Sequence, residues 1–180
     1  MSILKLVRTI FFIIFSKKKD YVFYSEKLSY QKYFITLIRA LSENSKTIVY
    51  FSSDIDDVIN DKNVRNYYIG SGTVLYFVFL MISAKNLIVT VPDLGNNFIK
   101  KTKNVDNYIY LFHAANSSHK QFTKKSFDNY DTIFCNGPYQ NIELRYLEKY
   151  NDKTKKLLIN GGYLYFDYLK NKANISKKNK

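Results

Sequence analysis

The chain has 180 residues, of which 46% are hydrophobic and 17% aromatic, and this composition excludes a protein that is disordered over its whole length. Its single cysteine excludes an internal disulfide, and its length suits one domain with its own core. The formal net charge is +13, but residues 1–19 and 171–180 hold nine basic and no acidic side chains, which leaves only +4 for residues 20–170.

The amino-terminal segment, MSILKLVRTIFFIIFSKKK, combines apolar and basic residues. Its longest apolar run, Ile10–Phe15, is far shorter than the ~20 residues that a membrane-spanning helix needs, and no signal-peptide cleavage site follows it. Two interpretations stay open for residues 1–19: a helix that lies on an anionic membrane surface, or a helix that packs on the domain with its lysines in water. The membrane contacts of the first interpretation are Lys5, Arg8, Lys17, Lys18 and Lys19.

Short apolar runs and helical stretches alternate along residues 20–170. The runs are mostly continuous and rich in Val, Ile, Tyr and Phe, which is typical of strands covered on both faces of a parallel sheet. The expected strands are Tyr21–Tyr24, Thr47–Phe51, Leu87–Val91, Tyr108–Phe112, Thr132–Cys135 and Lys156–Ile159. The expected helices are Tyr30–Leu41, Thr73–Ala84, Pro138–Tyr150 and Tyr163–Asn171. This order predicts the α/β class, as a Rossmann-like three-layer domain with a mostly parallel sheet.

The remaining charged segments have ordinary explanations. Residues 171–180, NKANISKKNK, are expected to form a solvated basic tail. The acidic run DIDD (54–57) is more typical of solvated turns and helix caps than of metal ligands. The middle of the chain has no helix-turn-helix, zinc-finger or aromatic RNA-binding signature, so we do not expect nucleic acid as a partner. It also has no dinucleotide-binding fingerprint, which disfavours an independent nucleotide-binding enzyme.

Polar or glycine-containing loops follow three consecutive predicted strands. His113 directly follows one strand, Asn136 and Gly137 follow the next, and Gly162 lies just after the third. Ligands of parallel α/β sheets bind beyond the carboxyl ends of the strands. The sequence therefore predicts a site at this edge of the sheet.

The residues of this segment have functional and structural interpretations. A neutral imidazole at His113 can take a proton from a hydroxyl nucleophile, whereas the residue pattern alone favours a histidine that only caps a strand end through hydrogen bonds. His119 follows Ser117 and Ser118, and no further ligands surround the histidine pair, so we expect no metal site. Cys135 is expected to be an inert buried thiol.

Four blocks of sequence occur in order between residues 87 and 169. They are LIVTVPDLGN (87–96), YLFHAANSSHKQF (110–122), SFDNYDTIFCNGPYQNIEL (126–144) and LLINGGYLYFDYL (157–169). Together the blocks resemble the amino-terminal half of bacterial CDP-glycerol glycerophosphotransferase-like proteins. This family belongs to the GT-B type of glycosyltransferase and builds teichoic acids and other surface polymers. The resemblance covers about half of the chain.

The resemblance implies roles for the residues that match the family's motifs. His113 falls on the histidine that serves the family as the base for the acceptor hydroxyl, so the resemblance favours that role over a cap. A GP-x-x-x-x-E helix and a Gly-Tyr-Pro-Arg-x-Asp-x-Leu segment follow in the family, and Gly162, Tyr163, Asp167 and Leu169 fall on the second. The candidate acceptor-binding residues are His119, Ser117, Ser118, Asn136, Gly137, Gly162 and Asp167.

The chain departs from the better-known family members at two places. Ala114 and Ala115 stand where those members have Gly-Thr, and Leu164 and Tyr165 replace the Pro-Arg pair. The patterns His-x-x-x-Ser-x-His and Phe-Asp-x-Tyr-Asp are closer to a divergent branch, so the resemblance does not identify the donor.

The resemblance also implies partners and a location. We expect a polyol or sugar acceptor, a CDP- or other nucleotide-activated donor, and a cytoplasmic protein peripheral on the inner face of the membrane. GT-B enzymes hold the donor mainly in a second Rossmann-like domain. We therefore expect this chain to be an acceptor-side domain with no cofactor of its own, completed by a second Rossmann-like domain that is supplied in the same chain or by a partner chain. The alternative is a non-catalytic Rossmann-like binding module at the membrane surface.

Overall fold

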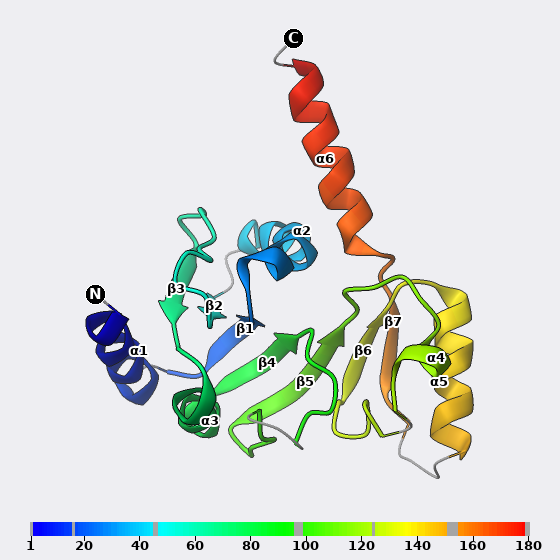
Figure 1. Ribbon diagram of the computed structural model, residues 1–180, viewed down its shortest axis with the longest axis horizontal. Helices are drawn as coiled ribbons and strands as arrows, with labels where there is room; N and C mark the ends of the chain where they lie inside the picture. The colour runs from blue at the N-terminus through cyan, green and yellow to red at the C-terminus, as the bar shows by residue number, and fades with distance from the viewer. Residues whose placement is uncertain are drawn as a thin grey trace.

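A computed structural model describes residues 2–15, 17–44, 47–95, 99–123, 125–150 and 155–178. Within these ranges the chain forms a seven-stranded sheet in which every neighbouring pair of strands is parallel (Figure 1). The strands are β1 (Lys19–Ser25), β2 (Ile48–Ser52), β3 (Val64–Tyr68), β4 (Ala84–Val89), β5 (Val105–Leu111), β6 (Thr132–Cys135) and β7 (Leu157–Asn160). Their spatial order is β3-β2-β1-β4-β5-β6-β7, so the direction of winding switches between β1 and β4.

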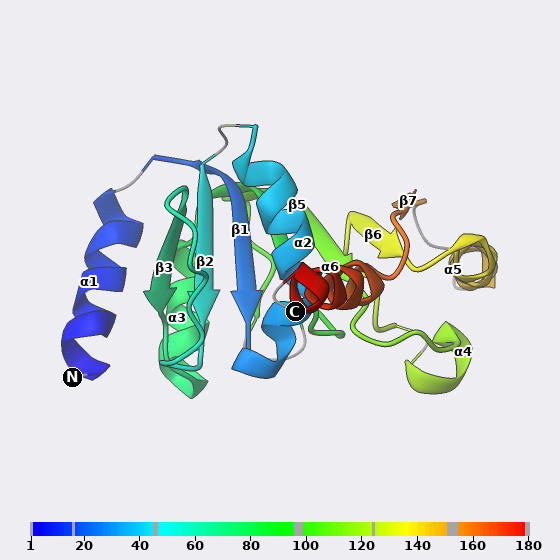
Figure 2. The ribbon, with the colours of Figure 1, turned by 90° about the horizontal axis from the view of Figure 1, so that it is seen from above.

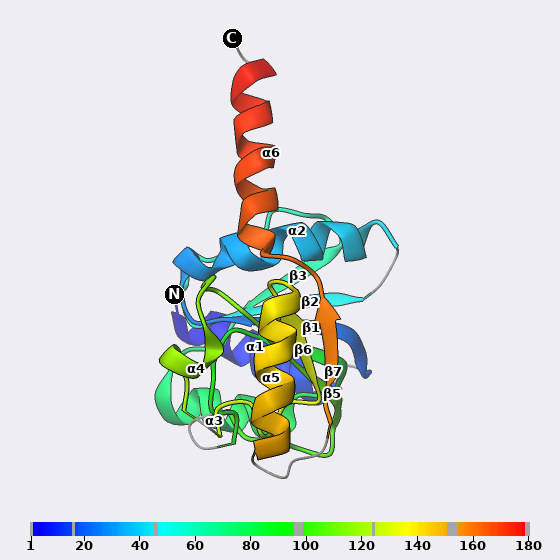
Figure 3. The same ribbon diagram turned by 90° about the vertical axis from the view of Figure 1, so that its right-hand side faces the viewer.

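Helices cover both faces of this sheet, which gives the three layers seen in Figures 2 and 3. The helices are α1 (Ser2–Phe15), η1 (Leu28–Tyr30), α2 (Gln31–Ser42), α3 (Gly72–Met81), α4 (Ser118–Gln121), α5 (Pro138–Tyr150) and α6 (Leu164–Lys178). The buried residues of α2 share one core cluster with β1 and β2, whereas those of α1, α3 and α5 belong to a cluster on the other face. The start of α6 packs on α2, and the rest of α6 extends away from the sheet (Figure 1).

The central strands are buried because helices cover both of their faces. All five residues of β2 are buried, while β7, at the edge, is partly exposed. In α2, Phe34 and Ile38 are fully buried one turn apart, which is the core-facing stripe that their spacing predicts. The predicted α/β class and the mostly parallel sheet are confirmed.

The structure differs from the expectation in several details, including a short helix, α4, that the sequence does not predict. The strand β3 (Val64–Tyr68) was not predicted, because Arg65 and Asn66 interrupt its apolar pattern. The helix expected to end at Ala84 ends at Met81, and Ala84 instead begins β4. The segment expected as a tail from residue 171 continues α6 to Lys178, with the side chains of residues 171–174 exposed.

The amino-terminal segment is a helix that packs on the domain. The Thr9 hydroxyl donates a hydrogen bond to the Tyr68 carbonyl at 2.7 Å, and the Phe12 ring stacks on Tyr67 with centroids 4.2 Å apart. Leu4 and Val7 on the outer face of the helix are 78% and 58% exposed. Within the described ranges, no helix is both long and apolar enough to cross a membrane.

The acidic run at residues 54–57 has a structural role through its last member. Asp57 is buried and accepts hydrogen bonds from the Tyr50 hydroxyl, the Ser52 hydroxyl and the Gln31 amide. These donors come from β2 and α2, so one carboxylate ties the loop after β2 to the helix above it. A buried carboxylate is tolerated when several hydrogen bonds satisfy it.

We predict that Asp57→Ala lowers the free energy of unfolding by about 3 kcal/mol, because several buried donors lose a charged acceptor. Urea denaturation followed by circular dichroism measures this change. The control is Asp56→Ala, which alters an exposed neighbour and should shift stability by less than about 0.5 kcal/mol. Equal stability of both variants would contradict the structural role of Asp57.

Candidate functional site

Three loops meet at the carboxyl edge of the sheet, as the sequence predicts. The Asn136 side-chain amide, after β6, donates a hydrogen bond to the Ala114 carbonyl at 2.9 Å. The Tyr163 hydroxyl, after β7, donates one to the His113 carbonyl at 3.0 Å. The loop after β5, which contains His113, is therefore held by residues that follow β6 and β7.

Two tyrosine rings from the neighbouring helical segment surround His113. The centroids of the Tyr30 and Tyr33 rings lie 5.3 Å and 6.1 Å from that of the imidazole, and both rings are edge-on to it. Tyr33 in turn contacts the rings of Tyr163 and Tyr165, with centroids 6.1 Å and 5.5 Å away. The imidazole thus stands at the edge of an aromatic cluster built from α2 and the start of α6.

This environment favours the neutral imidazole. Burial lowers the pKa of His113 from its ordinary value of 6.5, and a hydrogen bond with the Thr90 backbone opposes the shift without cancelling it. The Nδ1 atom is buried and has no hydrogen-bond partner among the described residues. At neutral pH the group is therefore an unprotonated base. Because protein atoms cover Nδ1, a hydroxyl group reaches it only after a nearby side chain moves.

The serines next to this loop are engaged in a structural contact. The Ser117 hydroxyl donates to Oε1 of Glu143 at 2.8 Å, and the Ser118 backbone N–H donates to Oε2 at 2.8 Å. Glu143 lies on α5 and is the acidic residue of the GP-x-x-x-x-E run. One carboxylate thereby fixes the turn that begins α4. The Ser118 hydroxyl is buried and, unlike that of Ser117, has no hydrogen-bond partner among the described residues.

The other predicted site residues differ in how firmly they are held and how exposed they are. The backbone N–H of Asn136 donates to the Gln140 side chain at 2.7 Å, so Asn136 is held at two points. Gly162 has φ +74°, a left-handed conformation that favours glycine, and Asp167 is exposed in the first turn of α6. Gly137 has open space where a side chain would stand. The side chain of His119 lies outside the described atoms.

Sequence reasoning missed the aromatic partners of His113. Tyr30 and Tyr33 belong to a helical segment early in the chain, and their spacing of three residues is equally typical of a core-facing stripe. The ammonium group of Lys32 lies 4.7 Å from the centroid of the Tyr165 ring, which adds a cation to the outer side of this cluster. Only the strand order, which brings α2 beside the loop after β5, reveals these neighbours.

Two further expectations concern metals and the cysteine. Among the described residues, no three or more His, Cys, Asp or Glu side chains are arranged to hold a metal ion. Cys135 is buried as expected, and burial raises the pKa of its thiol to about 11, so the thiolate is scarce at neutral pH.

The chain is thus a Rossmann-like three-layer α/β domain, and the carboxyl edge of its sheet carries His113 beside the rings of Tyr30 and Tyr33. No protein-family model matches the chain, and a comparison with curated proteins found no match.

We predict that the imidazole of His113 titrates below pH 6.5 in proton NMR spectra. Because its pKa is lowered on folding, the unfolded chain binds the proton more readily, and stability should fall as the pH drops from about 6.5 through the folded pKa. His113→Gln should remove this part of the slope. The chain has two histidines, so His119→Gln assigns the remaining signal. A His113 signal that titrates above 6.5 would contradict the burial argument.

Proposed function

We propose that the chain is the acceptor-side domain of a glycerophosphotransferase or glycosyltransferase that acts in the synthesis of a cell-surface polymer. The observation that carries this proposal is the neutral His113 at the carboxyl edge of the sheet, fastened by the loops after β6 and β7. Such a group can serve as general base toward an acceptor hydroxyl.

The proposed chemistry uses His113 and the aromatic cluster. An acceptor polyol or sugar lies against the tyrosine rings, whose apolar faces suit C–H groups. Its hydroxyl oxygen attacks the activated phosphorus or anomeric carbon of the donor, while the imidazole takes the hydroxyl proton. The nucleotide leaves with the electron pair of the broken bond. A second Rossmann-like domain holds this nucleotide-activated donor.

The contacts between the motif blocks support the proposal. Glu143 of the GP-x-x-x-x-E run fixes Ser117 and Ser118, and Tyr163 of the last block binds the backbone of His113. The blocks that carry the family resemblance are thus joined by hydrogen bonds around one histidine. If these blocks serve to position His113, this explains why they occur together in the sequence.

We predict that His113→Ala lowers the transfer rate by about 10²–10⁴-fold, the usual contribution of proton transfer by a positioned side chain. The assay supplies CDP-glycerol or a nucleotide sugar, a polyol acceptor and a chain that carries a second Rossmann-like domain. The 180-residue chain alone should be inactive or nearly so, because the donor is not positioned. The control is Tyr139→Phe, at an exposed position of α5.

Two outcomes would contradict different parts of the proposal. Equal rates for the His113→Ala variant and the unaltered chain would exclude His113 as the base. Strong turnover by the unaltered chain alone, lost in His113→Ala, would retain the base and exclude the need for a second donor-binding domain.

A second candidate function is a non-catalytic module that binds the inner face of the membrane. The outer stripe of α1 favours it, because Leu4, Val7 and Phe11 are 78%, 58% and 64% exposed at spacings of three and four residues. Arg8 is exposed next to this stripe. Apolar side chains beside cations suit a helix in the headgroup region of an anionic membrane. A peripheral location also fits the proposed transferase.

We predict that the chain co-sediments with anionic liposomes and that added salt weakens the binding, because screening reduces the attraction of the basic residues. Leu4→Ser together with Val7→Ser should reduce binding while leaving α1 docked, since neither side chain is buried. Ile142→Ser is the matched control, an exposed apolar residue on α5. If the double variant binds as well as the control, α1 is not the membrane contact.

A further inference from the structure

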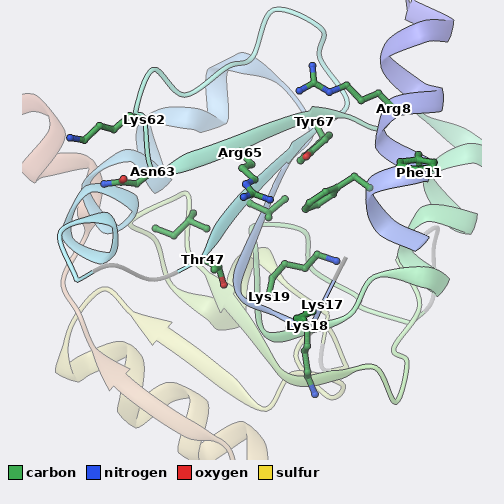
Figure 4. A pocket seen from close by; sticks show the side chains of 13 residues that line it. Arg8, Phe11, Lys17, Lys18, Lys19, Thr47, Lys62, Asn63, Arg65 and Tyr67 are labelled. Atoms are coloured by element: carbon green, nitrogen blue, oxygen red, sulfur yellow. The ribbon is translucent and has the colours of Figure 1, made fainter. Parts of the chain in front are cut away.

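A basic pocket lies at the amino edge of the sheet, opposite the edge that carries His113. It has a volume of about 850 Å³ and is lined by residues of α1, β2 and β3 and by the segment that joins α1 to β1 (Figure 4). Its cationic side chains are Arg8, Lys17, Lys18, Lys19, Lys62 and Arg65. No acidic side chain is among its described lining residues.

The packing of α1 on the edge strand preforms one wall of the basic pocket. Phe12 stacks on Tyr67 with ring planes 15° apart, and Thr9 is hydrogen bonded to the Tyr68 carbonyl. Arg65 and Tyr67 alternate with inward residues along β3, so both side chains reach the pocket side of this strand. This packing holds α1 against β3. Because protein atoms cover the ammonium nitrogen of Lys19, an anion in the pocket reaches that atom only after a neighbouring side chain moves.

Lys19 is the residue of the basic pocket that most needs an anion. Its side chain is buried, with 4% exposure, and its ammonium nitrogen has no hydrogen-bond partner among the described residues. The nearest compensation is the face of the Phe12 ring, 5.0 Å away. Burial lowers the pKa of Lys19, which shows the cost of holding the charge there. Buried charges are normally paired with an opposite charge.

The cations around Lys19 differ in their availability. Lys18 forms a salt bridge with Asp106 at 2.5 Å, so it is already engaged. Burial raises the pKa of the Tyr67 hydroxyl, and the positive charges of the nearby Arg65 and Arg8 oppose this rise. Figure 4 shows Arg65 and Lys19 in the middle of the pocket, with Arg8 and Lys62 at its margin.

Asp20 is the sequence neighbour of Lys19, but its carboxylate is satisfied by other groups. The Asp20 carboxylate pairs with Lys85 at 2.8 Å and accepts a hydrogen bond from the Thr47 hydroxyl at 2.7 Å. These contacts leave the positive charges of the pocket without a compensating carboxylate among its lining residues.

We propose that the basic pocket binds a phosphate-bearing anion, with Lys19 and Arg65 in direct contact with the phosphate oxygens and Arg8 and Lys62 adding charge at the margin. The guanidinium of Arg65 offers paired donors that match phosphate oxygens, and the ammonium of Lys19 acts as a point charge. The volume lies within the range of small-ligand pockets, so it accommodates a phosphate with an attached group.

This phosphate site does not rest on the proposed transferase function, because the two sites share no residue and lie at opposite edges. Lys19 begins β1 and Asn63 precedes β3, whereas His113 follows the carboxyl end of β5. The phosphate belongs either to a free phosphorylated compound or to a lipid headgroup. Phe11 lines the pocket and also belongs to the exposed stripe of α1, which makes both sources accessible.

The test measures binding of inorganic pyrophosphate by calorimetry, and binding of neutral phosphatidylcholine vesicles with and without added phosphatidic acid. Lys19→Met and Arg65→Gln should each weaken phosphate binding about tenfold or more, as expected for loss of a charged hydrogen bond. Lys149→Met, which removes the same charge from an exposed position on α5, should change it by less than about twofold.

The two probes separate the sources of the phosphate. Pyrophosphate binding that depends on Lys19, with vesicle binding unchanged by the variants, identifies a free phosphorylated ligand. Binding to phosphatidic acid vesicles that is lost in Lys19→Met identifies a lipid headgroup.

Thermal unfolding shows whether a variant binds less phosphate because it is less stably folded. Lys19→Met removes a buried unpaired charge, so the variant should be at least as stable as the unaltered chain without ligand. The unaltered chain and Lys149→Met should then gain clearly more stability than Lys19→Met on adding pyrophosphate. Failure of both probes to bind, or equal binding by Lys19→Met, would overturn the proposal.

Discussion

The seven described strands all run in the same direction, and this shared direction determines which loops can meet. It places every strand end of one kind at the same edge, so loops distant in sequence meet there. At the carboxyl edge this brings Asn136 and Tyr163 to the loop after β5, where they bind the carbonyl groups of Ala114 and His113. At the amino edge it brings Lys19 beside residues that precede β2 and β3. The sheet thereby separates an aromatic region with a neutral base from a cationic pocket.

Much of the fold could be predicted because the central strands are continuous apolar runs, and such runs form only where both faces of a sheet are covered. β2 is an example, with all of its residues buried. The edge strand β3 escaped prediction because an edge strand tolerates polar residues such as Arg65 and Asn66. Asn66 uses its side chain to bind the backbone of Ile59, a contact that only the folded loop creates.

The position of His113 could also be predicted, since it directly follows an apolar strand, but its surroundings could not. The strand order brings Tyr30 and Tyr33 next to the imidazole, and no local sequence pattern predicts that order. The polar residues near His113 proved to have a second role. The side chains of Ser117 and Asn136 form hydrogen bonds that hold the loop. Their presence near the histidine is therefore explained by the positioning of His113, without a ligand. The basic pocket is lined by residues of three separate segments of the chain, so the sequence did not predict it either.

The proposed transferase function requires an acceptor hydroxyl to bind beside His113. Amide chemical-shift mapping with an uncharged polyol or sugar oligomer tests it most directly, because such a ligand has no charge for the basic pocket to recognise. The perturbed amides should cluster at His113, Tyr33 and Tyr163, and His113→Gln should alter the pattern there. Perturbations confined to other parts of the chain, or none at saturating ligand, would contradict it.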